Sequence, residues 1–480
     1  MPPRKKGWPP SVHALVAECP GLHLSTTPDL TYDPWWELAS RLRHARFYLR
    51  FLDRRFRDMP ALLIRARTRA PRPAVHLAES LGLGRVARRL LVGIIDVLEQ
   101  STRSADAFAE YLRDRRPDLL VLTPLVVLKT DQLDMARAAT ELGIRNVFAV
   151  ASWDHLSSKG EINFAPQHVI VWNDVQKQEA TELHRLEAGR IVVTGSQVFD
   201  EWFDRQPSTT REQFCARVGL RPDRPILLYV CSGLLEGSPP EAPFVVRWAT
   251  HLRDSGDGVL RDCGILVRPH FKRGDEWRGH DFAGLDNIAC WPPLGDVPVD
   301  ARSKAAYFDS MYHAAAVVGL NTSAMIESAI LGRPVHTVLL PEFHDNQEGT
   351  LHFHYLLDGP NALLRATRSL DDHARDVAQV LAGRDPDPQR SLRFVRAFVR
   401  PCGLDVPATS RVVDTLEALA ASPAPAPVAV PAWARLIRPM LQPFATAAAE
   451  RMRRIDDRLR EQKKQVLIEH RQRKALVGRK

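Results

Sequence analysis

Short apolar runs alternate with amphipathic segments from residue 117 onward, and this alternation restricts the fold more than any other feature of the chain. A first series of apolar runs predicts strands over 118–123, 146–151, 168–172 and 190–194. Segments near 131–142 and 174–187 have the spacing of amphipathic helices. Strands separated by helices of this length form βαβ units around a parallel sheet.

A second series of the same kind follows the polar, proline-containing stretch 204–210. It predicts strands over 225–231, 264–268, 287–291, 316–320 and 334–340, and helices near 241–254, 304–315 and 324–331. Two Rossmann-like, doubly wound halves of this kind enclose a cleft between the carboxyl ends of their sheets. The sequence therefore predicts an α/β fold with functional residues facing that cleft.

A basic helix is expected near the N-terminus. It should begin at Asp33-Pro34, because Asp is a good N-cap and Pro is tolerated at the first helical position. Its apolar stripe is Trp35, Leu38, Leu42, Ala45, Leu49, Leu52 and Phe56, and its other positions include Arg41, Arg43, Arg46, Arg50, Arg54, Arg55 and Arg57. We interpret it as a helix packed on its own domain with the arginines in solvent; contact with a membrane surface is the alternative.

The C-terminal end has a linker and a second basic helix. The Pro/Ala-rich segment 422–433 should be extended. Beyond it, a helical stripe is typical either of an exposed tail or coiled-coil helix or of a membrane-docking helix: Phe444, Ala448, Met452, Ile455, Leu459 and Val466. We expect a basic helical region over 1–72, Rossmann-like domains over 73–205 and 206–421, the linker 422–433 and a basic amphipathic tail over 434–480.

The net formal charge of +9 belongs to the two ends. Residues 1–100 carry +8 and residues 450–480 carry +7, whereas residues 101–449 carry −6. A nucleic-acid enzyme is expected to carry positive charge on its binding domain, so this distribution fits an anionic membrane surface better and predicts no nucleic-acid partner. Because no long apolar run or signal peptide is visible, we expect a cytoplasmic protein, attached peripherally to the inner face of the plasma membrane.

The most specific segment is AVVGLNTSAMIESAILGRPV, residues 316–335. A buried strand leads into the polar turn Asn321, Thr322 and Ser323, and the helix that follows offers free N–H groups to a diphosphate. Glu327 lies one turn into this helix, where a carboxylate can accept both vicinal hydroxyls of a ribose. The alternative is a purely structural turn, in which these residues only cap the helix.

This segment resembles the nucleotide-binding βα unit in the C-terminal domain of GT-B glycosyltransferases, in which a Glu before Ala or Ser and a downstream Gly-x-Pro-Val recur. VTGSQVFD (193–200) is similar to a hinge of that superfamily. VRPH (267–270) resembles an element of its CDP-glycerol glycerophosphotransferase and capsule-polysaccharide branch, and SWD (152–154) with SSKG (157–160) resembles a loop of bacterial surface-polysaccharide proteins. The resemblance implies a GT-B fold, a nucleotide-activated donor such as a CDP or UDP compound, and no resident cofactor or essential metal.

Four residues that follow strands are candidates for catalysis. Arg268 and His270 offer a guanidinium and an imidazole to the charge that develops on a leaving nucleotide diphosphate. Asp154 and His155 lie in the opposite half, where a general base for the acceptor hydroxyl is needed. Asp154 matches the resembling loop and His155 has the more suitable pKa, so both stay candidates.

A polar cluster over 344–355 is expected at the mouth of the cleft. Gln347, Glu348 and Thr350 are candidates for contact with the nucleotide or sugar. Its histidines and Asp345 fit no standard ligand spacing, and the chain's six cysteines are scattered singly, so no metal site is predicted.

The chain departs from the GT-B pattern in two places. His270 is followed by Phe271, where the branch has proline, and the proline-rich stretch 1–33 lacks the usual first strand and helix. The first βα unit of the N-terminal domain is therefore expected to be missing. We predict a transferase that moves a sugar or polyol-phosphate unit to a surface-polysaccharide or lipid-linked acceptor. A nucleotide-sugar epimerase of related fold and a catalytically weak nucleotide-binding scaffold of a polysaccharide assembly complex are the alternatives.

Overall fold

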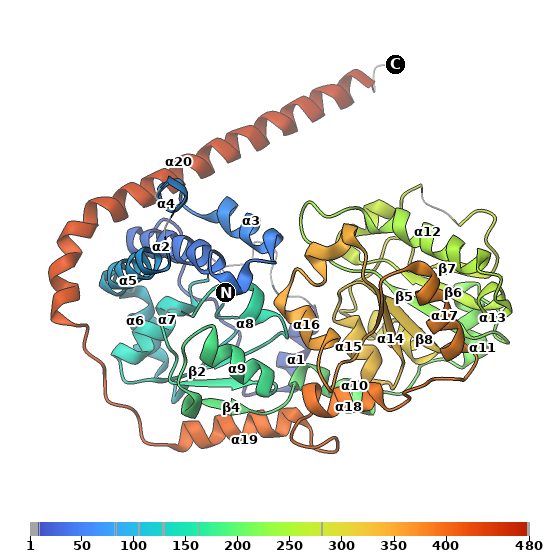
Figure 1. The fold of residues 1–480 in the computed structure, drawn as a ribbon. Coiled ribbons are helices and arrows are strands. Elements are labelled where there is room, and N and C mark those ends of the chain that lie inside the picture. The colour runs from blue at the N-terminus through green and yellow to red at the C-terminus, as the bar shows by residue number, and fades with distance from the viewer. Residues whose placement is uncertain are drawn as a thin grey trace.

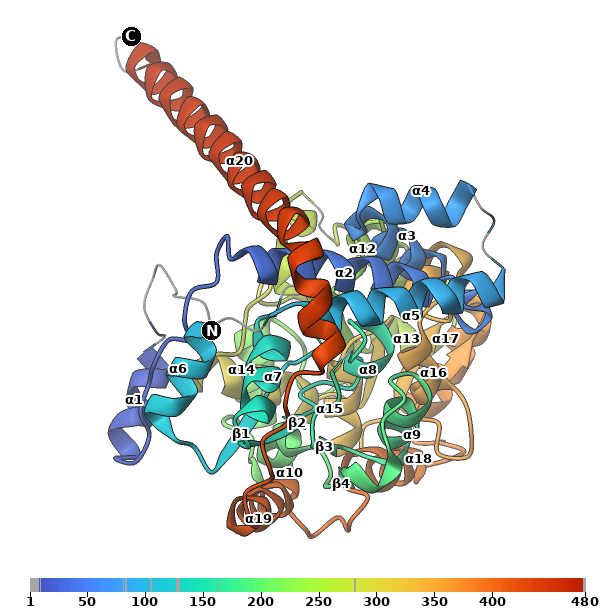
Figure 2. The same cartoon turned by 90° about the vertical axis from the view of Figure 1, so that its left-hand side faces the viewer.

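The computed structural model describes residues 8, 10–80, 82, 84–103, 106–126, 130–162, 164–279 and 282–477. The chain forms two lobes, each built on a parallel β-sheet with helices packed against it (Figure 1). A long C-terminal helix leaves the body and extends away from it (Figure 2). The predicted α/β fold with two parallel sheets is confirmed.

The first sheet has four parallel strands whose spatial order follows their order in the chain. They are β1 (Leu119–Leu122), β2 (Arg145–Ala149), β3 (His168–Val171) and β4 (Ile191–Val193). The connecting helices are α7 (Gln132–Glu141), the short α8 (His155–Ser158) and α9 (Asp174–Glu182). Among the described residues none before Leu119 belongs to a strand, so this sheet winds in one direction only.

The second sheet has six parallel strands in the order β10-β9-β8-β5-β6-β7. They are β5 (Ile226–Val230), β6 (Gly264–Arg268), β7 (Ile288–Cys290), β8 (Ala316–Gly319), β9 (Val335–Val338) and β10 (Arg365–Thr367). The strand order reverses between β5 and β8, which makes this sheet doubly wound. Its main helices are α11 (Arg211–Val218), α12 (Glu241–Asp254), α14 (Ala301–Tyr312), α15 (Ala324–Ile330) and α17 (Leu370–Leu381).

Every predicted strand is present, with bounds that differ by at most two residues, and among the described residues β10 is the one strand that the sequence did not predict. The apolar runs were informative because β5, β6 and β8 are buried along their whole length, as parallel strands covered by helices on both faces are. β10 has the sequence Arg-Ala-Thr, which shows no apolar run.

The hinge motif 193–200 holds together the two places where the chain crosses between the lobes. The Asp200 carboxylate accepts hydrogen bonds from Arg400 (2.8 Å) and from the backbone N–H groups of Ala408 (3.1 Å) and Thr409 (2.6 Å). Gly195 has a φ of +90°, and a Cβ there would lie 2.9 Å from the Cβ of Ala408. The hinge therefore requires glycine at this position.

After this second crossing, α19 (Ala408–Ala421) covers the outer face of the first sheet. Its Val412, Leu416 and Leu419 pack against residues of β2 and β3, namely Val147, Ala149 and Ile170. The sequence analysis assigned 408–421 to the second domain, but the structure places this helix on the first lobe. Local sequence could not show this, because the partner strands lie more than 230 residues away in the chain.

A helical layer precedes the first sheet in the chain. It contains α1 (Pro10–Glu18), α2 (Pro34–Phe51), α3 (Pro60–Arg69), α4 (Arg72–Ser80), α5 (Arg85–Ser101) and α6 (Asp106–Arg115). Helix α2 begins where the sequence predicts, and the Asp33 side chain accepts a hydrogen bond (2.8 Å) from the Trp36 N–H. Helices α2, α3, α4 and α5 share an apolar core that includes Phe47, Phe51 and Ile95, whereas α6 packs against α7.

The expected solvent-exposed basic face of α2 is wrong. Arg43, Arg46 and Arg50 are all buried. Burial alone would lower the pKa of Arg43, but ion pairs with Asp134 (2.8 Å) and Glu99 (2.7 Å) raise it. Arg43 and Arg46 form ion pairs with carboxylates on α5 and α7. Helix α2 is therefore buried on its basic side as well as on its apolar side.

The segment 423–431 is extended, as predicted, and leads into α20 (Ala432–Val477). The first part of α20 packs on α2 and α5 through Ala434, Leu441, Ala445, Ala448 and Ala449. Pro439 and Pro443 lie inside this helix, which bends over the first lobe (Figure 1).

The stripe predicted for the tail is divided in the structure. Ala448 is buried against the body, whereas Phe444, Ile455 and Leu459 are exposed; the Val466 side chain lies outside the described residues. In the part of the chain that the structure describes, no helix has the length and apolar character to cross a membrane.

Candidate functional site

A cavity of about 290 Å³ lies between the lobes, lined by segments that follow β2, β5, β6, β8 and β9. The carboxyl ends of parallel strands meet at one edge of a sheet, which is why these segments converge. Six predicted site residues line it: Asp154, His270, Asn321, Thr322, Ser323 and Thr350. Other lining residues include Arg65, Lys159, Gly233, Asn346 and His352.

The turn between β8 and α15 offers unused hydrogen-bond donors. No described residue accepts a hydrogen bond from the backbone N–H of Thr322 or Ser323, and both residues line the cavity. Asn321 is occupied, because its side-chain amide donates to the backbone carbonyl of Asn346 and its N–H donates to Ser232 Oγ (3.0 Å). The turn is thereby held in place while two of its N–H groups stay open to an anion.

His270 lies against Gly233, and this contact requires glycine. A Cβ on residue 233 would lie 2.9 Å from Cε1 of the His270 ring. His270 Nδ1 accepts a hydrogen bond from the Lys272 N–H (3.3 Å), which leaves the ring proton on Nε2. Burial lowers the pKa of His270, and Lys272 and Arg273 lower it further. His270 is therefore a neutral hydrogen-bond donor at neutral pH.

Asp154 lies on the first-lobe side and is held as a carboxylate. Ser152 Oγ (2.6 Å) and Ser158 Oγ (2.9 Å) donate to it, and Lys159 Nζ lies 3.0 Å from Oδ2. Burial would raise its pKa, but Lys159 and His352 hold the pKa of Asp154 well below its ordinary value. Three donors already engage the carboxylate oxygens, so the main effect of Asp154 on the cavity is electrostatic.

His352 is a cavity residue whose role the sequence did not reveal. Its ring packs edge-on against Trp153, with 4.7 Å between ring centroids. Burial lowers the pKa of His352 to about 4 despite the attraction of Asp154, so the imidazole is neutral at physiological pH. Nδ1 has no hydrogen-bond partner among the described residues. The sequence analysis considered His352 only as a possible imitation of a metal ligand.

Arg268 and Glu327 form a second cluster in the second lobe and do not line this cavity. The Arg268 guanidinium donates to Ser310 Oγ (3.0 Å) and lies 4.9 Å from the centroid of the Tyr307 ring. The Tyr307 hydroxyl donates to Glu327 Oε2 (2.5 Å). Burial raises the pKa of Glu327 to about 7, although the hydrogen bond from Tyr307 lowers it.

The other predicted site residues lie outside this cavity. His155 is buried on α8, and burial lowers its pKa; it does not line the cavity. Gln347 is buried, and its amide donates to Thr337 Oγ1 (3.0 Å) and to the carbonyl of Val338. Glu348 pairs with Arg368 (2.7 Å) at the surface. In the described part of the chain, no three His, Cys, Asp or Glu side chains are grouped to hold a metal ion.

The chain matches no family model, and no curated protein matches it. Several solved structures are similar to the chain over about two thirds of its length. UDP-GlcNAc 2-epimerase from Neisseria meningitidis bound to UDP-GlcNAc is 12% identical, with 68% of this chain and 82% of that chain covered and a TM-score of 0.45. A glycosyltransferase from Rickettsia africae ESF-5 is 10% identical over 68% and 82% of the two chains, with a TM-score of 0.42.

The wall teichoic acid polymerase TagF is 12% identical over 67% of this chain and 86% of that chain, with a TM-score of 0.39. Similarity this distant says nothing about activity, so the fold is identified from the topology of the chain itself. Two parallel sheets, the second doubly wound, face each other across a cavity at their carboxyl ends, and a C-terminal helix crosses back to the first lobe. The chain has a GT-B-like fold.

Proposed function

We propose that this protein is a transferase that moves a sugar or polyol-phosphate unit from a nucleotide-activated donor to a surface-polysaccharide or lipid-linked acceptor. One observation carries the proposal. Open anion-binding donors from the turn after β8 and the neutral imidazole of His352, which lies on α16 (Leu351–Leu357) of the second lobe and packs against Trp153 of the first, line the same cavity.

The second-lobe side suits the diphosphate of the donor. The N–H groups of Thr322 and Ser323 and the Nε2–H of His270 can donate to phosphate oxygens without giving up another partner. These donors would also stabilise the charge that develops on the leaving diphosphate. Lys159 adds a positive charge from the opposite side of the cavity.

The Tyr307–Glu327 pair suits the nucleoside. Glu327 follows the phosphate-facing turn by one helical turn, and Arg268 and Trp291 border the same cluster. The Glu327 carboxyl can exchange its bond with the Tyr307 hydroxyl for bonds with ribose hydroxyls. This exchange would couple donor binding to a group whose pKa is raised by burial.

His352 suits the role of general base. In the transfer step, the acceptor oxygen forms a bond to the transferred unit as the bond from that unit to the diphosphate oxygen breaks. The proton of the acceptor hydroxyl passes to the His352 imidazole, and the Asp154 carboxylate stabilises the imidazolium that results. This division of roles gives Asp154 an electrostatic function instead of the base function.

A nucleotide-binding scaffold is the second candidate. It is favoured by one observation, which is that Asp154 already accepts from Ser152 and Ser158 and pairs with Lys159. A scaffold would bind nucleotide through the second lobe and show no turnover with any donor. A nucleotide-sugar epimerase would turn over a donor with no acceptor present.

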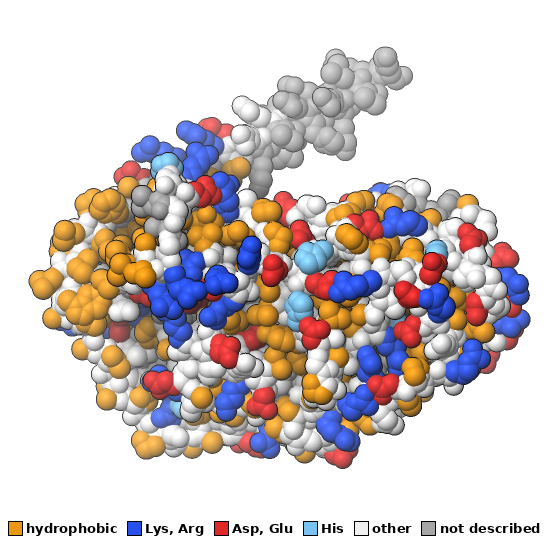
Figure 3. Space-filling model, in the orientation of Figure 1, with side chains coloured by type: hydrophobic (Ala, Val, Ile, Leu, Met, Phe, Trp, Pro, Cys, Tyr) orange, Lys and Arg blue, Asp and Glu red, His pale blue; other side chains and the backbone are white. Residues whose placement is uncertain are grey.

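Peripheral attachment to an anionic membrane is part of the proposal. Two neighbouring helices expose an apolar stripe, which consists of Val86, Leu90, Ile94 and Val97 on α5 and Leu436, Met440 and Phe444 on α20. Figure 3 shows apolar side chains gathered over this part of the first lobe, next to a group of basic side chains. Apolar side chains flanked by basic ones are typical of helices that lie in a membrane interface.

The test is nucleotide binding by a variant that removes one N–H from the cavity. Ser323 has a φ of −61°, which a proline ring matches, so Ser323→Pro deletes the donor without changing φ. Thermal-shift screening of CDP, UDP, GDP and dTDP compounds identifies the ligand for the wild type. Calorimetry should then show an affinity about tenfold lower for Ser323→Pro, because a charge-assisted hydrogen bond is lost.

Ser323→Ala is the matched control, since it removes the hydroxyl and keeps the N–H. Equal affinity of wild type and Ser323→Pro, with equal melting temperatures, would rule out this turn as the diphosphate site. Turnover of a donor with no acceptor present would favour the epimerase, and nucleotide binding without turnover of any donor would favour the scaffold.

A further inference from the structure

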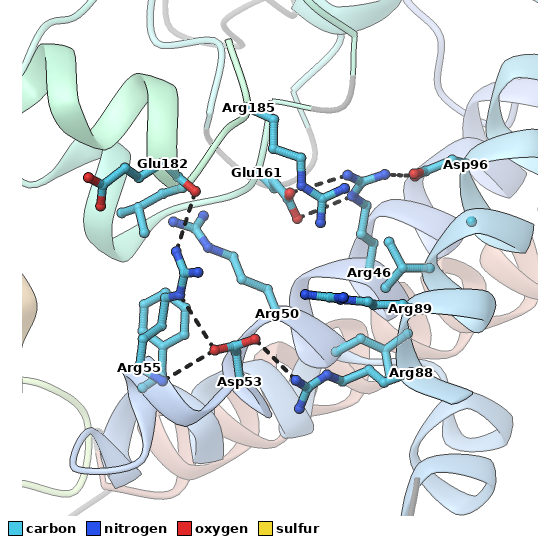
Figure 4. Close-up of a pocket in the computed structure, with 15 residues that line it drawn as sticks. Arg46, Arg50, Asp53, Arg55, Arg88, Arg89, Asp96, Glu161, Glu182 and Arg185 are labelled. Atoms are coloured by element: carbon cyan, nitrogen blue, oxygen red, sulfur yellow. Dashed lines mark hydrogen bonds and ion pairs between the residues drawn. The ribbon is translucent and has the colours of Figure 1, made fainter. Parts of the chain in front are cut away.

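A larger cavity, of about 470 Å³, lies inside the first lobe and shares no lining residue with the cavity between the lobes. Helices α2 and α5 and the segment after α9 enclose it (Figure 4). Six guanidinium groups surround it, those of Arg46, Arg50, Arg55, Arg88, Arg89 and Arg185. Four carboxylates also line it, so the cavity has an excess of two positive charges.

Only some of these arginines are neutralised. Arg46 forms ion pairs with Asp96 and with Glu161 (3.1 Å). Asp53 forms ion pairs with both Arg88 (3.1 Å) and Arg55 (3.4 Å). The fourth carboxylate, Glu182, is bound by the Gln178 amide (2.8 Å) and points away from the arginines in Figure 4.

Arg50 is the cation with the poorest compensation. Only 9% of its surface is exposed, and it donates to the backbone carbonyls of Leu156 (2.8 Å) and Lys159 (3.2 Å). Its Nε has no partner, and no described carboxylate lies within ion-pair distance of Arg50, Arg89 or Arg185. Glu161 and Glu179 attract Arg50 only from beyond ion-pair distance. A buried guanidinium without a paired carboxylate is unfavourable, so the site favours a further anion.

The apolar stripe lies beside this cavity on the same helix. Arg88, Arg89 and Asp96 line the cavity, while Leu90 and Ile94 are exposed on the adjacent face of α5. Successive residues of a helix turn by about 100°, so the two sets occupy neighbouring faces. Figure 3 shows the basic side chains directly beside the apolar surface of this lobe. A molecule with an anionic group and an apolar tail would satisfy both surfaces at once.

We propose that the arginine cavity binds the phosphate or diphosphate group of a lipid, whose apolar part lies along the stripe on α5 and α20. The excess of two positive charges matches a phosphate monoester or a diphosphate. Arg50 connects this site to the cleft, because one carbonyl that it binds, that of Leu156, lies in α8 and the other belongs to Lys159, a residue that lines the cleft cavity. This assignment goes beyond the proposed transfer reaction and does not depend on the identity of the donor.

The test uses Arg89→Gln combined with Arg185→Gln, since both side chains are exposed and neither has a carboxylate partner among the described residues. The matched control is Arg85→Gln with Arg217→Gln, which removes the same charge from two exposed arginines outside the cavity. Pyrophosphate binding is measured by calorimetry in a Ser323→Pro background, so that the cleft contributes little. The cavity variant should bind pyrophosphate at least about tenfold more weakly, and the control should match its parent.

Vesicle flotation separates a lipid from a free phosphate. Wild type should prefer phosphatidylcholine vesicles that contain phosphatidic acid over pure phosphatidylcholine vesicles, and the cavity variant should lose that preference. Leu90→Ser with Ile94→Ser should weaken vesicle binding and leave pyrophosphate affinity unchanged. Unchanged pyrophosphate affinity in the cavity variant would show that the arginine cavity is not an anion site. An equal preference of wild type and cavity variant for vesicles with phosphatidic acid would show that the ligand of the cavity is not a lipid. In the wild-type background, the arginine substitutions and the Leu90→Ser and Ile94→Ser substitutions should leave nucleotide affinity unchanged, which separates this test from that of the transfer function.

Discussion

Glu327 should destabilise the ligand-free protein at high pH, and Glu327→Gln should relieve this effect. Burial raises the pKa of Glu327 from 4.5 to about 7, so the folded state holds a proton that the unfolded state releases at lower pH. Stability is therefore fully present below pH 4.5 and is lost as the pH rises through 7. The difference corresponds to about 3 kcal/mol once the carboxyl is ionised.

Glutamine keeps an oxygen that can accept from the Tyr307 hydroxyl, and it carries no charge at any pH. Glu327→Gln should therefore melt at about the same temperature as wild type near pH 4.5. At pH 8.5 it should melt several degrees higher, since about 1 kcal/mol corresponds to about 2–4 °C for a lobe of this size. Melting curves followed by circular dichroism across this pH range measure the difference.

The same substitution should weaken nucleotide binding by about 1.5–3 kcal/mol, because charge-assisted hydrogen bonds to ribose are lost. A gain in stability with a loss of affinity is the pattern expected of a residue kept for function. A stability difference that does not change with pH would refute the titration argument. Unchanged nucleotide affinity would remove Glu327 from the site.

Three further predictions concern the cavity, the hinge and the tail. Gly233→Ala should displace the His270 ring and weaken nucleotide binding about tenfold in calorimetry, with an unchanged melting temperature. Asp200→Asn should leave Arg400, which is 5% exposed, without its carboxylate, and should lower the free energy of unfolding in urea by about 3 kcal/mol; a change near zero would contradict the stabilising role of the Asp200–Arg400 ion pair. Removal of 461–480 should weaken flotation with anionic vesicles and leave the melting temperature unchanged, because the part of α20 that contacts the body, which extends to the hydrogen bond between Tyr32 and Asp456, is retained. Equal flotation of the shortened and full-length chains would show that the tail does not contact the membrane.

Strands and turns at the cleft could be predicted from the sequence because they depend on neighbouring residues. β5 and β8 read as apolar runs since both of their faces are buried, and the polar residues that follow a strand must reach the carboxyl edge of the sheet. This is why the turn at 321–323 and His270 were found.

Contacts between distant segments could not be predicted in the same way. An arginine in solvent and an arginine paired with a carboxylate look alike in a helical pattern, and the partners of Arg43 lie 56 and 91 residues away. His352 is a cavity residue because its helix packs beside the loop that carries Trp153, about 200 residues earlier. Neither the ion pairs of Arg43 nor the contact between His352 and Trp153 can be recognised from the spacing of residues in the local sequence.

The return of α19 and α20 to the first lobe affects how the chain folds during synthesis. The outer face of β2 and β3 stays uncovered until α19 has been made, and one side of α2 stays uncovered until α20 has been made. At ribosomal rates of about 5–20 residues per second, tens of seconds pass between the synthesis of the first sheet and the synthesis of α19 and α20. During that interval the apolar side chains Val147, Ala149 and Ile170 are available to chaperones. A fragment that ends at the hinge should therefore aggregate unless the segment 408–450 is supplied as a separate chain.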